Sequence, residues 1–183
     1  LLASSRNLVE LIYNLSKWSS LHGQKIKPDF ISFDLIQTIK ETINQNMINF
    51  QLKQIKIETE IESEVFIYAD KEMTATIVRN LISNAIKFTP TNGKIKIVCK
   101  EFDDKVQLSI IDNGVGISQD KIAMLEAGNS VESSTGTSNE KGTGLGLTIC
   151  REFIKANEGT LSINSTIGEG SEFIISFQKQ NGN

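Results

Sequence analysis

Cysteine, histidine and proline are scarce in this chain, whose 183 residues include two cysteines, one histidine and two prolines. Cys99 and Cys150 lie far apart and have no CxxC spacing, so the sequence predicts neither a disulfide framework nor a zinc site. His22 is followed by Gly23 and has no catalytic or metal-binding partner at a recognisable spacing. We interpret the cysteines as small buried side chains in a reducing compartment and His22 as a surface or linker residue.

Long apolar runs and an excess of positive charge are also lacking. No apolar stretch approaches the roughly 20 residues that a membrane-spanning helix needs, and no segment has the charged-then-apolar pattern of a signal peptide. The formal net charge is −3, with acidic and basic residues interspersed, so we expect no nucleic-acid partner and no polybasic membrane patch. The hydrophobic fraction of 39% is enough for a core, and we expect a soluble piece of a longer protein.

The N-terminal segment has apolar residues at heptad spacing, at Leu1, Leu8, Leu11, Leu15 and Trp18. This pattern predicts a helix over residues 1–22 that pairs in a bundle or coiled coil. Three heptads also fit an amphipathic helix that packs on its own domain. Residues 23–30, which include Pro28, are typical of a linker, and residues 31–180 are expected to form one folded domain.

Beyond the linker, helical and strand-like segments alternate, with no repeat at a fixed period. The expected helices span Leu35–Phe50, Asp70–Phe88, Ser118–Leu125 and Gly144–Ala156. The expected strands span Ile31–Asp34, Ile55–Glu60, Val65–Ala69, Lys94–Phe102, Lys105–Asp112, Gly159–Ser165 and Glu172–Phe177. We predict that Ile55–Glu60 pairs with Val65–Ala69 and that Asp70 caps the helix that follows it. The pattern indicates an α/β or α+β domain.

A polar tract and a glycine run follow one another in the second half of the chain. Residues 128–140 are mostly Gly, Ser, Thr, Asn and Glu, so we expect a mobile segment with almost nothing to bury. Glycines at 142, 144 and 146 then describe a bare backbone loop that opens a helix. Such a loop suits phosphate, because main-chain N–H groups can approach it at a helix N-terminus. By itself the run also fits a tight connection.

Two groups of polar residues add chemistry to this loop. Asn80, Asn84 and Lys87 are spaced to share one helix face, where amide oxygens suit Mg²⁺ and an ammonium suits a polyphosphate. A solvated helix face fits the same spacing. Asp112 ends a buried strand immediately before Gly114 and Gly116, where its carboxylate could accept from the adenine amine or simply form an Asx turn.

Together these motifs resemble those of sensor histidine kinases. Asn80–Pro90 resembles their asparagine box, and Asp112–Ile117 and Gly142–Leu147 resemble two of their glycine boxes. The flanks are similar too, since Gly168–Phe173 resembles the last glycine box and Asn14–Leu21 the second helix of the dimerisation and phosphoacceptor hairpin. The resemblance implies an α+β fold, a two-layer α/β sandwich of the Bergerat type. Its mixed sheet would carry helices on one face, with one hairpin helix before it.

The resemblance also implies residue roles in binding ATP and Mg²⁺. Asn84 would hold Mg²⁺ with Asn80 sharing or supporting that task, Lys87 would contact phosphate, and Asp112 would accept from the adenine amine. The other residues implied in nucleotide binding are Phe88, Gly114, Gly116, Ile117, Gly142, Thr143, Gly144, Leu145, Gly146 and Ser171.

The implied reaction is transfer of the ATP γ-phosphoryl group to a histidine on a helix outside this sequence, because the phosphoacceptor histidine is missing here. The phenylalanine motif that many histidine kinases carry before the lid is missing too. Asn80 stands where ATP-hydrolysing relatives typically carry a glutamate base, and an amide cannot serve as that base. The alternatives are a superfamily ATPase, an anti-sigma-type serine kinase, and a scaffold without nucleotide that pairs through residues 1–21.

The resemblance further implies partners and a location. A response regulator receiver domain would act downstream, and the full protein would form a homodimer through the N-terminal hairpin. The domain would be cytoplasmic and belong to a membrane-anchored sensor, which would reach the membrane only through regions outside this sequence.

Overall fold

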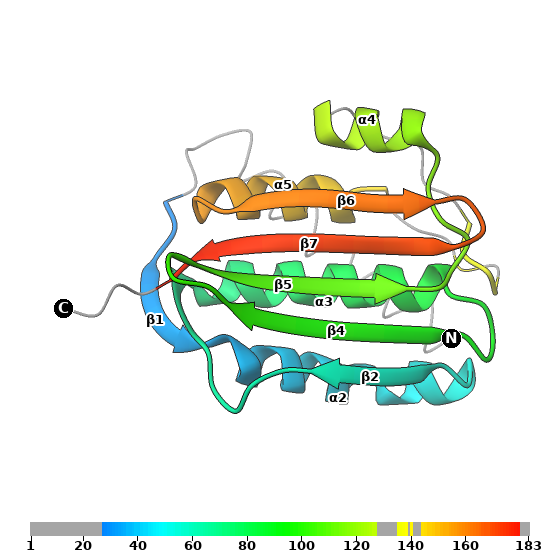
Figure 1. Ribbon diagram of the computed structural model, residues 1–183, viewed down its shortest axis with the longest axis horizontal. Helices are drawn as coiled ribbons and strands as arrows, with labels where there is room; N and C mark the ends of the chain where they lie inside the picture. The colour runs from blue at the N-terminus through cyan, green and yellow to red at the C-terminus, as the bar shows by residue number, and fades with distance from the viewer. Residues whose placement is uncertain (1–26, 128–134, 139, 141–143, 180–183) are drawn as a thin grey trace, which may run out of the picture.

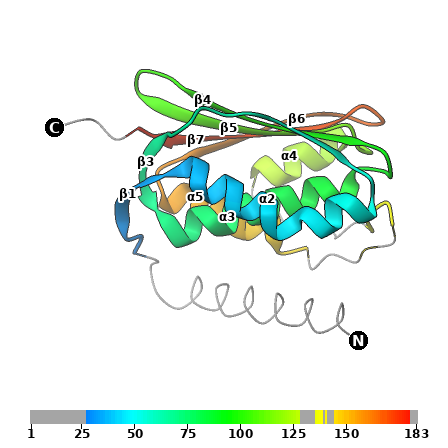
Figure 2. The ribbon, with the colours of Figure 1, turned by 90° about the horizontal axis from the view of Figure 1, so that it is seen from below.

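The computed structural model describes residues 27–127, 135–138, 140 and 144–179. The helix expected over residues 1–22 and most of the linker lie outside these residues. The described chain forms a five-stranded sheet with helices on one face, and a separate two-stranded sheet lies at one end (Figures 1 and 2). The predicted two-layer α+β arrangement is confirmed.

The main sheet is mixed, with the strand order β2-β4-β5-β7-β6. Its strands are β2 (Lys56–Glu60), β4 (Lys94–Glu101), β5 (Lys105–Asp112), β6 (Thr160–Thr166) and β7 (Gly170–Gln178). β2 runs parallel to β4, and the other neighbours are antiparallel. Apolar side chains alternate with polar ones in the first half of β4, which buries Ile95 and Ile97 and leaves Lys94 and Lys96 on the opposite face.

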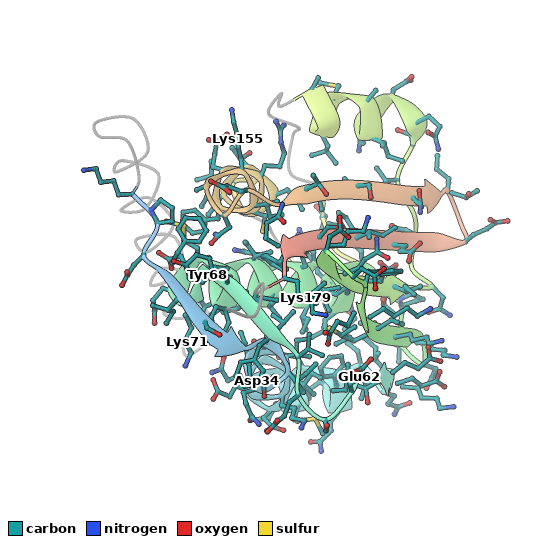
Figure 3. The ribbon with its side chains drawn as sticks, turned by 60° about the vertical axis from the view of Figure 1, so that its left-hand side comes forward. Asp34, Glu62, Tyr68, Lys71, Lys155 and Lys179 are labelled. Carbon is teal, nitrogen blue, oxygen red and sulfur yellow. The ribbon has the colours of Figure 1, made fainter. Side chains whose placement is uncertain are left out.

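Helices α2 (Leu35–Leu52), α3 (Lys71–Phe88) and α5 (Gly146–Ala156) cover one face of this sheet, as Figure 2 shows. The short helix α4 (Gln119–Ala127) contacts the edge strand β6. Asp34, labelled in Figure 3, caps α2 by accepting from the N–H of Ile36. Asp70 caps α3 in the same way through the N–H of Met73, as predicted.

The predicted pairing of Ile55–Glu60 with Val65–Ala69 is wrong. β3 (Phe66–Asp70) pairs antiparallel with β1 (Phe30–Asp34), while β2 joins the main sheet beside β4. The connection between β2 and β3 contains neither glycine nor asparagine for a tight hairpin turn. Instead, the Asp34 carboxylate accepts from the N–H of Val65, which directs the chain toward β1.

The core lies between the helices and the main sheet. Its fully buried side chains include Leu35, Ile39, Phe50, Ile77, Leu81, Ile95, Ile97, Phe153 and Phe177. Cys99 and Cys150 are free thiols within this core. Burial raises the pKa of each thiol to about 12. Within the described part of the chain, no helix combines the length and apolar character needed to cross a membrane.

Candidate nucleotide-binding site

The carboxyl half of α3 carries the predicted metal and phosphate residues. Asn80 is 9% exposed, and its Nδ2 donates to the carbonyl of Thr76, which leaves the amide oxygen as an acceptor. Asn84 and Lys87 follow on the next turns and are half-buried. Burial lowers the pKa of Lys87 although the nearby Glu140 carboxylate opposes the shift. The Lys87 ammonium lies 4.6 Å from the centre of the Phe88 ring.

Asp112 ends β5 as a buried carboxylate, 6% exposed. It accepts a 2.8 Å hydrogen bond from the N–H of Gly114 and a second from the N–H of Ser171, its partner residue on β7. Burial raises the pKa of Asp112, and these two hydrogen bonds only partly offset that shift. The hydroxyl of Ser171 lies 3.0 Å from that of Ser165. The carboxylate therefore sits at the end of the sheet with little solvent, and neutral backbone N–H groups are what orient it.

The loop after β5 fits only because two of its residues are glycines. A Cβ on Gly114 would overlap the carbonyl oxygen of Phe88 at the end of α3. Gly116 has a φ of 70°, and a Cβ there would overlap the carbonyl of Thr166. The loop is thus held between α3 and the turn that joins β6 to β7. Ile117 completes the contact by donating from its N–H to the Ser165 hydroxyl at 2.8 Å.

The start of α5 lies beside Asn80. A Cβ on Gly146 would stand 3.1 Å from the amide oxygen of Asn80, so the two helices approach closely at this point. Gly144 has a φ of 74°, and Leu145 is the N-cap residue but makes no side-chain capping bond. Unlike Asp34 of α2 and Asp70 of α3, the N-cap residue of α5 has an apolar side chain that accepts no hydrogen bond from the first turn. Gly142 and Thr143 lie outside the described residues.

The donor set fits a nucleotide with a hard cation. The N-terminus of α5 and the Lys87 ammonium suit phosphate oxygens, whereas the Asn80 and Asn84 amides suit Mg²⁺ that keeps water or phosphate ligands. Among the described residues, no group of three or more His, Cys, Asp or Glu side chains could hold a metal. These residues suit a cation that arrives with phosphates better than a metal held by protein ligands alone.

Lys53, Thr137 and Glu140 are the residues that sequence reasoning missed. Lys53 lies just after α2, and its ammonium contacts the end of α3, Thr137 and Glu140. Gly136–Ser138 and Glu140 belong to the stretch expected to be mobile, and each of them makes hydrogen bonds in the structure, whereas residues 128–134 and 139 lie outside the described residues. Hydrogen bonds hold this part although it buries little apolar surface. One sequence feature does distinguish Lys53, because it is the first charged residue after Glu41.

A cavity of about 320 Å³ lies elsewhere, between α4, α5 and β6. Leu125, Leu147, Arg151, Leu161 and Ile163 are among the residues that line it. Arg151 closes one side by donating to the carbonyl of Leu125 at 2.6 Å. None of the predicted nucleotide-binding residues lines this cavity.

Comparison with known proteins agrees with this geometry. The family model of histidine kinase-, DNA gyrase B-, and HSP90-like ATPases matches residues 69–181. The adaptive-response sensory kinase SasA of Gloeothece citriformis is 38% identical over 136 residues, which cover 73% of this chain and 34% of that protein. The chain also spans less than half the length of other sensory kinases that it matches.

Two solved structures are similar in fold. The catalytic domain of the histidine kinase ThkA has a TM-score of 0.72 and 26% identity, covering 82% of this chain and 98% of that domain. Histidine kinase ThkA in complex with the response regulator protein TrrA has a TM-score of 0.77 and 23% identity, covering 96% of this chain and 49% of that chain. At that identity the second likeness is one of fold alone.

Proposed function

Because the chain belongs to the family of histidine kinase-, DNA gyrase B- and HSP90-like ATPases, we propose that it transfers the γ-phosphoryl group of ATP to a histidine on another segment. The chain has the catalytic ATP-binding domain of a sensor histidine kinase. One observation carries the proposal. Asn80, beside Gly146 of α5, and Phe88, against Gly114, both belong to α3, so this one helix contacts glycine segments at both ends of the candidate site.

At the adenine end, Asp112 would accept a hydrogen bond from the exocyclic amine. An ionised carboxylate only accepts, so it would disfavour a base that presents an oxygen at that position. The N–H groups of Gly114 and Ser171 orient the carboxylate. Phe88, Ile117 and the glycine loop would flank the base.

At the phosphate end, Asn80 and Asn84 would hold Mg²⁺ together with phosphate oxygens, and Lys87 would contact a phosphate. The bound cation would neutralise charge that spreads over the transferring phosphoryl group. Gly144, Leu145 and Gly146 would orient the phosphates by presenting main-chain N–H groups at the start of α5. We extend this role to Gly142 and Thr143 from the sequence alone.

Asn80 argues against the ATPase alternative. An amide has no useful proton affinity near neutral pH and cannot activate water. The Asn80 amide group is also fixed, because its Nδ2 donates to the Thr76 carbonyl at 3.0 Å. Transfer to a histidine needs no base at this position, since the imidazole is itself the nucleophile.

We further propose a response regulator receiver domain as the partner that accepts the phosphoryl group next. The support is the fold likeness to ThkA, which was solved with the response regulator TrrA. In the whole protein, the helix over residues 1–22 would form a dimer, and segments outside this sequence would reach the membrane. The ATP-binding domain itself would work in the cytoplasm, where its two free thiols stay reduced.

A transfer assay tests the proposal. The chain is incubated with Mg²⁺, γ-labelled ATP and a polypeptide that carries the phosphoacceptor helix of a sensor histidine kinase. We expect label on histidine, recognised because it survives base and is lost in acid. Label on serine would favour the serine-kinase alternative, and free phosphate alone would favour the ATPase. Absence of ATP binding by calorimetry would remove all three.

A further inference from the structure

We propose that Lys53 is a positioning residue that fixes Gly136–Ser138 and Glu140 against the carboxyl end of α3, and with them the backbone of Lys87. We call Lys53, Thr137 and Glu140 the Lys53 clip. The inference rests on the proposed function only for its effect on nucleotide binding. The contacts of the clip join only residues of this chain.

The Lys53 ammonium is surrounded by four oxygen atoms. Its three N–H groups are shared among the carbonyls of Ile86 at 2.7 Å and Lys87 at 3.1 Å, the Thr137 hydroxyl at 2.7 Å and Glu140 Oε1 at 3.0 Å. The Lys53 side chain is 9% exposed, so these oxygens replace most of its water. The two carbonyls belong to the last turn of α3, where unpaired C=O groups favour a cation.

Capping of α3 alone does not account for this arrangement. Two of the four oxygens come from Thr137 and Glu140, which lie 84 and 87 residues away from Lys53 in the chain. Thr137 adds bonds of its own, from its N–H to the Lys87 carbonyl at 3.0 Å and from its hydroxyl to the Thr89 carbonyl at 2.8 Å. Lys53 therefore joins two segments that already meet at Lys87.

Glu140 supplies the negative charge of the Lys53 clip. Burial opposes its ionisation, but the hydrogen bonds from Lys53 and from the N–H of Ser138 hold its pKa below the ordinary value. Its main-chain carbonyl also accepts from the N–H of Gly136 at 2.8 Å. The clip thus keeps three N–H groups bonded, those of Gly136, Thr137 and Ser138.

The link to nucleotide binding is Lys87. Its carbonyl accepts from both Lys53 and Thr137, while its side chain is the predicted phosphate contact. Loss of the Lys53 ammonium would leave the Lys87 carbonyl with Thr137 as its remaining clip partner and would remove the cation from Glu140 Oε1. We therefore expect a less defined Lys87 position and weaker binding of Mg·ATP.

Hydrogen exchange of the ligand-free chain tests the clip directly. In Lys53→Met, we expect the N–H groups of Gly136, Thr137 and Ser138 to exchange at least about tenfold faster than in the wild type. Lys56→Met is the matched control, because that lysine is exposed and pairs only with Glu58 among the described residues. Amides of β5 and β7 should stay within about twofold in both variants if the fold is intact. Unchanged exchange at these three N–H groups in folded Lys53→Met would overturn the inference.

Two further variants separate positioning from a loss of folding. Glu140→Gln keeps an acceptor oxygen but removes the charge, so it should give a smaller increase in exchange. In Lys53→Ala, added n-propylammonium replaces the missing ammonium and should restore both protection and Mg·ATP affinity, which a global defect would not allow.

Measurement of Mg·ATP binding tests whether Lys53 positions Lys87. In Lys53→Met we expect Mg·ATP affinity to fall roughly tenfold or more, and Lys56→Met should bind as the wild type does. Faster exchange with unchanged affinity would overturn the positioning role. If the wild type binds no ATP, the proposed function fails instead, and the exchange comparison still decides whether the clip exists.

Discussion

At Asp112, stability and binding make opposite demands. Adenine binding would require the ionised carboxylate, but burial of that carboxylate destabilises the folded state. A carboxylate that is 6% exposed loses most of its hydration, and the N–H groups that donate to it carry no full charge. Burial therefore raises its pKa, despite hydrogen bonds from Gly114 and Ser171. Because folding raises the pKa of this acid, the ionised form destabilises the folded state once the pH exceeds the unfolded pKa. The effect is complete above the folded pKa.

Asp112→Asn should therefore separate stability from binding. We expect a higher melting temperature than the wild type for the ligand-free variant at pH 7, with the difference shrinking as the pH falls through the raised pKa of the folded state and lost below the pKa of an unfolded aspartate. ADP affinity should fall by roughly 1–3 kcal/mol, because a mispaired buried group faces the adenine amine. Calorimetry and thermal melts provide the measurements, with Asp103→Asn in the exposed β4–β5 turn as control. Unchanged ADP affinity would remove Asp112 from the pocket.

Two glycines in the β6–β7 turn provide a second test at the scale of one residue. Gly168 and Gly170 both have positive φ, 82° and 111°. A Cβ on Gly170 would overlap the carbonyl of Asp112, whereas one on Gly168 would meet nothing within 4 Å. Alanine at either position costs about 1–2 kcal/mol of backbone strain, and Gly170→Ala adds roughly 1–3 kcal/mol of overlap.

Urea unfolding of the two alanine variants measures this difference. Gly170→Ala should be clearly less stable than Gly168→Ala and should also lose ADP affinity, since the β5 backbone at Asp112 must shift. Equal free energies of unfolding for the two variants would mean that the turn moves away from the end of β5 with no loss of stability.

At the scale of elements, the edge strand β2 is held by charges as well as by its backbone. Glu58 accepts from Lys94 at 2.7 Å and from Lys56 at 2.9 Å on the open face of the sheet. Hydrogen bonds from Lys94 and then Lys56 lower the pKa of Glu58 from 4.5 to about 2. A lowered pKa stabilises the folded state above the unfolded value, and this contribution disappears as the pH falls toward 2.

Glu58→Gln should remove that pH dependence. We expect its free energy of unfolding to be below the wild-type value at pH 7, with the two curves converging between pH 4.5 and about 2. The groups are solvent-accessible, so the difference should be small and should shrink in high salt. Parallel curves across this range, at low salt, would exclude the ion pairs as the cause.

The elements also show which parts of the fold the sequence could predict. The Asp70 cap, the β4–β5 hairpin and the amphipathic helices follow from local patterns, because period and capping residues are local. The partners of β2 and β3 do not, since Asp34 turns the chain at Val65 from 31 residues away. The contacts of Lys53 were not predicted for the same reason. Its partners are distant in sequence, and a lone lysine after a helix carries no periodic signal.

For the candidate site, the motifs predicted which residues come together but not how the protein holds them. Asn80, Asp112, Phe88 and the two glycine loops were identified from spacing and resemblance. The closeness of Gly146 to Asn80 and the positive φ of Gly144 before α5 required the structure. Such details depend on helix packing, which sequence periodicity does not specify.

At the scale of the whole molecule, the candidate site joins elements that are otherwise separate. Asn80 and Lys87 come from α3, Asp112 from β5, Ser171 from β7 and Gly146 from α5. A ligand that bridges them binds the folded state and not the unfolded chain, so it raises stability by linkage. At a free concentration of 100 times Kd, the gain is about 2.7 kcal/mol.

Thermal melts with and without Mg²⁺ can therefore test which residues bind the cation and which bind adenine. We expect ATP alone to raise the melting temperature, and Mg²⁺ to add a further increase that EDTA removes. Asn84→Ala should lose most of the Mg²⁺-dependent part and keep the rest, whereas Asp112→Asn should lower both, because adenine contact anchors the ligand. Ser83→Ala, an exposed neighbour on α3, is the matched control. If Asn84→Ala kept the full Mg²⁺-dependent increase, the cation would have to be held by other groups, and the metal role of Asn84 would fail while adenine recognition by Asp112 stood.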